Sequence, residues 1–282
     1  MKLCKSTWIN LLQWRDNPKY LAVAVYIVIT LWYSLRGICD YAAELDARIH
    51  PWIFPFLMRG GGTIYPLMLG YTILISDAPF RSRQQQFVLL RTGKAIWLGG
   101  QILYLFLLST AFTLLLYLLT LVFILPRIRL SAEWGDFLTT IAVTGLPGKY
   151  GCISAKYTVM NGVSAVEATL WAMTVLIFVC FLLGMIMLLC NLWMKKGTGL
   201  VIVSCMVILP QLTSIFQSKP YIYRYITWIS PLNWIDRSVL GYTGQNLPSY
   251  TYAFVMPIVL SLIFIITGMS TIHRCNLETD KE

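Results

Sequence analysis

Charged residues are scarce in this 282-residue sequence. They make up only 12% of the chain, whereas 57% of residues are hydrophobic and the mean hydropathy is +0.68. Soluble domains carry about 25% charged residues, so this composition excludes an ordinary water-soluble fold. Six membrane spans of about 20 residues each, with their loops, would use most of the chain and leave little for a separate soluble domain.

Signatures of enzymes and metal sites are also lacking. The sequence has no GxxxxGK[ST] loop for a nucleotide phosphate, no HExxH zinc motif and no GxSxG nucleophile turn. The few acidic residues cluster near the predicted helix ends, which leaves no obvious coupling site for protons or sodium at mid-membrane depth. We therefore expect a chain with no catalytic site, no metal, no bound cofactor and no energy source of its own.

The seven cysteines follow no metal-binding spacing. Cys39 and Cys152 both fall in predicted outer loops. The sequence leaves open whether these two thiols form a disulfide.

Long apolar runs dominate what is present. They predict an all-α integral membrane protein, a single transmembrane domain over residues 1–282 with six transmembrane helices. The third and fourth runs are long enough that their helices should tilt or protrude. In the second run, Arg59 and three following glycines predict an interruption of the helix. The six runs cover residues 20–38, 54–76, 95–125, 165–194, 198–216 and 252–272.

The distribution of Lys and Arg predicts the orientation. More than half of the 22 basic residues fall in short segments that face the cytoplasm if both termini do, and such segments resist translocation. The net charge of +10 then indicates contact with lipid head groups and not with nucleic acid. We expect a multi-pass protein of the cell membrane with cytoplasmic N- and C-termini. The inner set is Lys2, Lys5, Arg15, Lys19, Arg81, Arg83, Arg91, Lys94, Lys195, Lys196, Arg274 and Lys281.

The N-terminal segment 1–18 precedes the first apolar run. Trp8, Leu11, Leu12 and Arg15 recur at helical spacing, and Pro18 then interrupts the pattern. This predicts an amphipathic helix in the inner head-group layer, with a solvated basic tail as the alternative.

Segment 77–94 joins the second and third apolar runs. Pro79 ends the incoming helix, and residues 81–90 then predict a short amphipathic helix. Its apolar edge suits a groove on another protein, while its basic side chains suit acidic groups or lipid phosphate. The alternative is a solvated loop that acts only as a topology signal. The candidate coupling residues are Asp77, Phe80, Arg81, Arg83, Phe87, Leu90, Arg91 and Lys94.

Two outer segments complete the chain. Segment 217–250 is rich in Tyr and Trp and is punctuated by prolines, which predicts short re-entrant helices in the outer leaflet or an ordinary interfacial aromatic belt. Segment 126–165 is a basic outer loop, in which Ser131 is a candidate N-cap for a helix over residues 133–143.

Together these features resemble the six-helix permease subunits of type-2 ABC exporters. Residues 75–94 (ISDAPFRSRQQQFVLLRTGK) look like the family's cytoplasmic coupling segment, and residues 229–234 (ISPLNW) are similar to its outer re-entrant turn. The likeness covers nearly the whole chain, although segment 126–165 is longer than the family pattern. On this resemblance the outer turn residues of interest are Ser230, Pro231 and Trp234.

The resemblance implies the missing energy source. An ABC ATPase subunit, present in two copies and binding ATP and magnesium, would dock on segment 77–94. Phe80, Phe87 and Leu90 would fill its groove, and the basic residues would fix the register. A second permease subunit, identical or different, would complete the pathway. The cargo stays open, and so do two other classes: a non-transporting immunity or assembly factor, and an ATP-independent channel or carrier.

Overall fold

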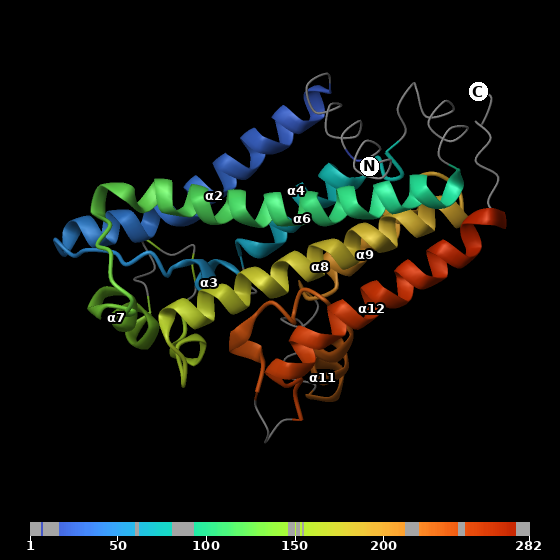
Figure 1. Cartoon of the computed structure of the whole chain (residues 1–282). Coiled ribbons are helices and arrows are strands. Elements are labelled where there is room, and N and C mark those ends of the chain that lie inside the picture. Colours follow the sequence, from blue (N-terminus) through green and yellow to red (C-terminus); the bar gives the residue numbers. More distant parts are fainter. Residues whose placement is uncertain are drawn as a thin grey trace.

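The computed structural model describes residue 7 and residues 17–59, 62–80, 93–145, 150, 153, 155–211, 220–241 and 246–274. These residues form an all-helical bundle in which the long helices lie roughly along one common direction (Figure 1). In this part of the chain, extended backbone pairs only in an isolated bridge between Ile49 and Ile128. The predicted all-α class is confirmed for the described residues.

Four helices in the described part of the chain are long and apolar enough to cross a membrane. They are α2 (Pro18–Glu44), α6 (Lys94–Ile124), α8 (Ala165–Trp193) and α12 (Tyr250–Thr271), with 27, 31, 29 and 22 residues. At about 1.5 Å per residue, α6 and α8 are roughly 45 Å long. Both therefore exceed the ~30 Å hydrocarbon core of a bilayer, as their sequence lengths predict.

The other two predicted spans contain shorter helices. The second holds α3 (Phe54–Leu57) and α4 (Ile64–Ile75), so the helix is interrupted around Arg59 as predicted. The fifth holds α9 (Thr198–Ile208), and residues 212–216 of that span lie outside the described part of the chain. The count of six spans stays a prediction.

Short elements complete the described part of the chain. The helices are α7 (Asp136–Thr144) and α11 (Pro220–Ile229), and the 3₁₀ turns are η1 (Leu125–Arg127), η3 (Tyr157–Val159), η4 (Arg237–Val239) and η6 (Ile272–Arg274). The helix predicted over residues 133–143 starts later, at Asp136. The Ser131 hydroxyl does accept a hydrogen bond from the Glu133 N–H, at 3.2 Å, but Gly135 has a φ of 76° and therefore separates that turn from the helix.

Side-chain caps mark the starts of three long helices, α2, α8 and α12. Asn17 accepts a hydrogen bond from the Lys19 N–H, and Pro18 occupies the first helical position of α2. Ser164 caps α8 and Ser249 caps α12 in the same way. Pro18, which interrupts the N-terminal pattern, thus starts the first long helix.

Helix α8 lies at the centre of the bundle. In its most apolar stretch 72% of residues are buried, against 22% to 39% in the other three long helices. It packs against α12, α6, α9, α4 and α3. Tyr71 of α4 joins three of these helices, because its hydroxyl bonds the Ser109 hydroxyl of α6 at 2.9 Å and donates to the Cys180 carbonyl of α8 at 3.0 Å.

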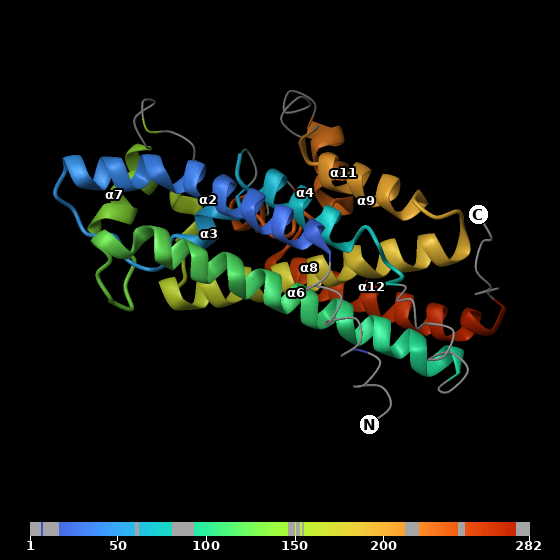
Figure 2. The ribbon, with the colours of Figure 1, turned by 90° about the horizontal axis from the view of Figure 1, so that it is seen from above.

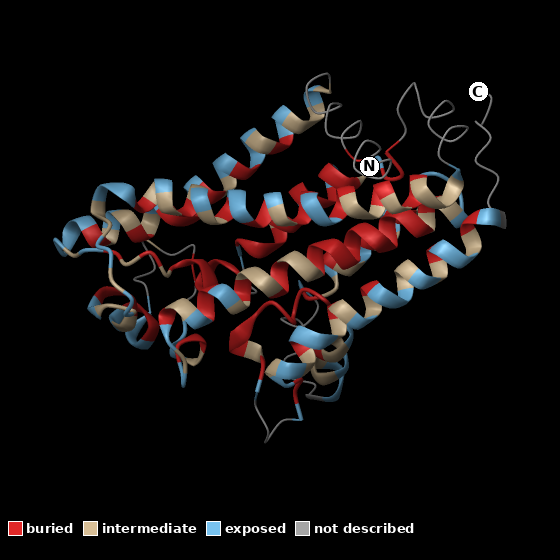
Figure 3. Cartoon of the chain, in the orientation of Figure 1, coloured by how far each residue is buried: buried red, intermediate tan, exposed pale blue. Residues whose placement is uncertain are grey.

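Exposed residues lie along the outward faces of α2, α6 and α12 (Figure 3), and many of them are large apolar residues. On α2 they recur every three or four residues, which makes a continuous stripe along one side of the helix. In water such a surface would be costly, whereas lipid tails accept it. The most exposed apolar residues on α2 are Leu21, Val25, Ile29, Trp32 and Tyr33.

Helices α2, α6 and α9 run in one direction and α4, α8 and α12 run in the other (Figures 1 and 2), so the described parts of the segments predicted to face the cytoplasm lie toward one end of the bundle. We call it the Asp77 end. It holds the starts of α2, α6 and α9 and the ends of α4, α8 and α12. The opposite end, which we call the α7 end, holds α7 and the start of α8. At that end Cys39 is a free thiol whose Sγ contacts the Phe123 carbonyl, and Cys152 lies outside the described residues.

Replacing Tyr71 by Phe should destabilise the bundle by about 1 kcal/mol, because the buried Ser109 hydroxyl loses a partner. Thermal unfolding of the detergent-purified protein measures this, and Tyr33→Phe, at an exposed tyrosine, is the matched control. Equal melting temperatures for the two variants would contradict the three-helix role of Tyr71.

Candidate functional site

The candidate site is the short segment Ser76 to Phe80, where the chain leaves α4 at the Asp77 end. The Ser76 hydroxyl donates to the Ile73 carbonyl at 2.8 Å, and the Ala78 N–H donates to the Ile75 carbonyl at 3.0 Å. Pro79 has no N–H and cannot continue the helix. The chain therefore turns here toward the neighbouring helices.

Gln101 of α6 holds the end of this segment from one side. Its side-chain amide accepts a hydrogen bond from the Phe80 N–H at 3.0 Å and donates to the Phe80 carbonyl at 3.1 Å. Both residues are buried. The Phe80 ring packs edge-on against Tyr104, with ring centroids 4.5 Å apart. Both backbone polar groups of Phe80 are thus satisfied by one side chain, which fixes the segment to α6.

Asn191 of α8 holds the segment from the other side. Its Nδ2 donates to the Ala78 carbonyl at 2.7 Å, and its Oδ1 accepts from the Gly197 and Gly199 N–H groups at 3.2 and 2.9 Å. Gly197 and Gly199 lie at the start of α9. One buried amide therefore connects the end of α4 with the α8–α9 turn.

Gly199 makes this close approach possible. A Cβ at this position would lie 2.6 Å from the Met187 carbonyl and 2.8 Å from Asn191 Oδ1. The carbonyl belongs to helix backbone and has little freedom to shift. Any larger residue would therefore separate α9 from α8.

Lys19 ties the segment to the start of α2. Its Nζ donates to the Ser76 hydroxyl at 2.9 Å and pairs with Asp77 Oδ2 at 2.7 Å. The Asp77 side chain is half exposed, so this ion pair contributes little to stability. It does set the position of α2 against the end of α4.

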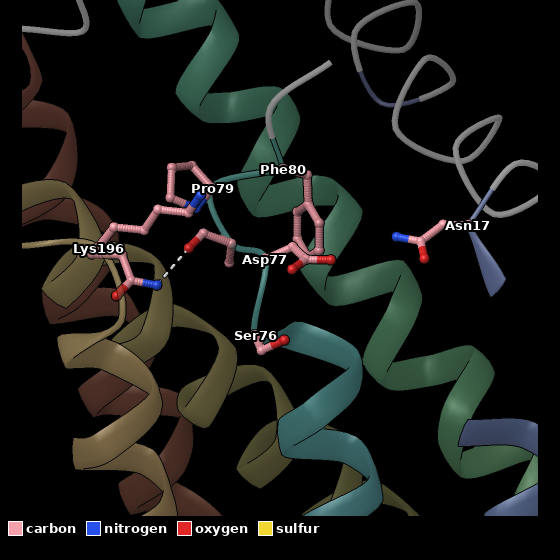
Figure 4. Close-up of a pocket in the computed structure, with 8 residues that line it drawn as sticks. Asn17, Ser76, Asp77, Pro79, Phe80 and Lys196 are labelled. Carbon is pink, nitrogen blue, oxygen red and sulfur yellow. Dashed lines mark hydrogen bonds between the residues drawn. The ribbon is translucent and has the colours of Figure 1, made fainter. Parts of the chain in front are cut away.

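These contacts surround a pocket of about 230 Å³ (Figure 4). Asn17, Lys196 and residues of the candidate segment line it together with Asn191. Among the described residues, no group of three or more His, Cys, Asp or Glu side chains could hold a metal ion. The pocket therefore lies at a joint between helices, where polar side chains form hydrogen bonds to backbone groups.

The structure describes three of the eight predicted coupling residues. Asp77 and Phe80 lie in the segment, and Lys94 begins α6, where its Nζ donates to the His273 carbonyl at 3.5 Å. The other five, which are Arg81, Arg83, Phe87, Leu90 and Arg91, lie outside the described residues.

For Phe80, prediction and structure differ. The sequence predicts a side chain that fills a groove on a partner, but its ring is only 2% exposed. The reason is that the turn at Pro79 brings the chain onto α6, where Gln101 and Tyr104 enclose the residue. Phe80 therefore anchors the segment to its own chain.

Gln101, Asn191 and Lys19 are the site residues that sequence reasoning missed. The first two are amide side chains in apolar helices, and this is a signal that could have found them. Of the predicted amphipathic segment 1–18, residues 1–16 lie outside the described part except for Thr7, which is buried and whose hydroxyl donates to the Gly100 carbonyl at 3.3 Å.

At the other side of the molecule, the predicted outer turn residues Ser230, Pro231 and Trp234 are all buried. Trp234 donates its ring N–H to the Trp228 carbonyl at 3.2 Å and packs edge-on against Tyr252. The aromatic turn is thus packed against the start of α12.

Arg59 has its partner in the same outer segment. Its Nε donates to the Ser238 hydroxyl at 3.2 Å, and Asp236 acts on it electrostatically. This contact accommodates the arginine that interrupts the second apolar run.

Comparison with models of protein families, with curated proteins and with solved structures finds no match to this chain.

Replacing Asn191 by Ala should leave the Ala78 carbonyl and two N–H groups without their partner. We expect a loss of about 2–4 kcal/mol in unfolding free energy and a fall of roughly 5–10 °C in melting temperature. Asn161→Ala, at an exposed turn residue, is the control. Similar melting curves for both variants would rule out Asn191 as the joint.

Proposed function

We propose that this chain is the membrane-spanning permease subunit of an ATP-driven exporter. The observation that carries the proposal is the anchoring of the Ser76–Phe80 segment by side chains from α2, α6 and α8. A loop that served only as a topology signal would not need ties to three helices.

The anchors define how movement would pass into the bundle. A partner bound to residues 81–94 would pull on Phe80, which Gln101 links to α6. The same movement would reach α8 and α9 through Asn191 and α2 through Lys19. The helices would then shift as packed rigid bodies, which is the usual form of such transitions.

The proposed partners follow from this mechanism. Two copies of an ABC ATPase subunit would bind and hydrolyse ATP with magnesium and would dock on the coupling segment. A second permease subunit, the same chain or a different one, would enclose the cargo pathway. This chain would bind no cofactor itself, would not be an enzyme and would contact membrane lipids but not nucleic acid.

The proposed topology has six spans in the cell membrane and cytoplasmic termini. The second span would consist of α3 and α4, and the fifth would begin with α9. Support comes from basic residues that gather at the Asp77 end, because inner loops retain Lys and Arg. Helix α11 and the turn after it would re-enter the outer leaflet. The described basic residues at that end are Lys19, Lys94, Lys195, Lys196 and Arg274.

Charge reversal of both Arg81 and Arg83 to Glu, or Phe87→Asp, should detach the ATPase or uncouple export. We expect at least a roughly tenfold loss of ATPase co-purification or of ATP-driven transport, with unchanged melting temperature. Arg129→Glu, an exposed arginine far from the segment, is the control. Unaltered ATPase binding and export would sink the proposal in favour of a non-transporting protein or an ATP-independent channel.

Exchanging the two charges of the Lys19–Asp77 pair tests transmission within the chain. Lys19→Asp and Asp77→Lys should each change the melting temperature little, because the pair is worth at most about 1 kcal/mol. Each should nevertheless lower ATP-driven transport while the ATPase stays bound. The double exchange should restore transport, and a double variant no better than the singles would show that the pair does not transmit movement.

A further inference from the structure

Buried polar atoms that lack a hydrogen-bond partner gather in residues 230–237. Among the described residues they include the Ser230 hydroxyl, Asn233 Nδ2 and Arg237 Nε. The three residues are 0%, 6% and 8% exposed. Buried polar groups in folded proteins are normally paired, so several unpaired groups in one short stretch point to a bound partner, either water or a ligand.

The backbone holds these groups in a compact turn. The Asn233 N–H donates to the Ser230 carbonyl at 3.1 Å, so the backbone of these two residues is joined in one turn. Arg237 begins η4, which contacts η3. On η3, the Thr158 hydroxyl is also buried and unpaired. We call Thr158, Ser230, Asn233 and Arg237 the outer polar cluster, and each member can donate a hydrogen bond.

The charge of Arg237 is not balanced by a close carboxylate. No described Asp or Glu lies within 4 Å of its guanidinium. Its neighbour Asp236 accepts hydrogen bonds from the Ser238 N–H and hydroxyl at 2.9 and 2.6 Å and stabilises the charge of Arg59. Arg237 is therefore a cation in residues 230–237 whose charge no nearby described carboxylate balances.

Aromatic rings hold this cation in place. Its guanidinium carbon lies 4.4 Å from the centroid of Tyr250 and 5.6 Å from that of Trp171. Burial lowers the pKa of Arg237, whereas Tyr250 and the more distant Glu167 raise it. The guanidinium stays protonated, since arginine does not lose its proton in proteins.

We propose that the outer polar cluster binds a phosphate group. A planar, positioned guanidinium and several uncharged donors match the oxygen atoms of phosphate, and together they exclude a cationic ligand. The inference rests on the proposed function, and it identifies the cargo class as a molecule that carries phosphate. The same chemistry has two sources, a phospholipid head group beside the bundle or a free phosphate.

Calorimetric titration of the purified full-length chain in neutral maltoside detergent at physiological salt tests this. The probes are dihexanoyl phosphatidylglycerol, inorganic phosphate and, as the acyl-chain control without phosphate, the neutral lipid dihexanoylglycerol. Preferential binding of the anionic lipid assigns the site to a lipid head group, and binding of inorganic phosphate assigns it to free phosphate. Binding of neither, or equal binding of both lipids, overturns the proposal.

Two variants assign the binding to the cluster. Arg237→Gln should weaken binding at least ~10-fold, because it removes a charge-assisted hydrogen bond. Arg129→Gln, at the exposed arginine, should leave it unchanged. Ser230→Ala should weaken binding roughly 3- to 10-fold while raising the melting temperature of the unliganded protein, because an unpaired buried hydroxyl has been removed. Should the hydroxyl be paired with trapped water instead, Ser230→Ala would leave phosphate affinity unchanged, and this result would also overturn the proposal.

These titrations need no ATPase, so they are independent of the coupling experiments. If phosphate binds but the coupling variants have no effect, the phosphate site is supported and the exporter proposal is refuted. If phosphate does not bind but the coupling variants lose export, the exporter proposal is supported and the phosphate site is refuted.

Discussion

The side chain of Asn191 makes the interaction on which the arrangement at the Asp77 end depends. It satisfies the carbonyl of Ala78 and two N–H groups at the start of α9. Polar backbone at the end of apolar helices has to be paired, and here one amide does so for two separate parts of the chain. The absence of a side chain at Gly199 is the condition for this contact, since a Cβ would meet the Met187 carbonyl.

The candidate coupling segment and the outer polar cluster use polar groups in opposite ways. At the candidate coupling segment, the side chains of Gln101 and Asn191 form hydrogen bonds with backbone groups, which makes a stiff joint. In the outer segment, Ser230 and Arg237 are buried with unpaired atoms. A stiff joint suits the transmission of movement, whereas unpaired donors suit the binding of an anionic group. The central helix α8 connects the two regions, because it carries both Asn191 and Trp171, which lies against Arg237.

Several local features follow from the sequence. The apolar runs predicted six spans, four of which contain a helix of sufficient length in the described residues, and Arg59 with its glycines predicted the break between α3 and α4. The buried position of Phe80 did not follow. An aromatic residue after Pro79 in a basic segment reads as a docking side chain, and only the packing of Gln101 and Tyr104 around it decides otherwise.

The sequence by itself determined the helical class, the membrane-compatible surfaces and the position of the segment between α4 and α6, because hydropathy and helix-breaking residues act over a few neighbouring residues. The tertiary structure alone decided which polar side chains hold that segment and which residues surround Arg59 and Arg237. Gln101 is 21 residues from Phe80, and Asn191 is 113 residues from Ala78. Partners this far apart are brought together by helix packing, and no local pattern records which helices will be neighbours.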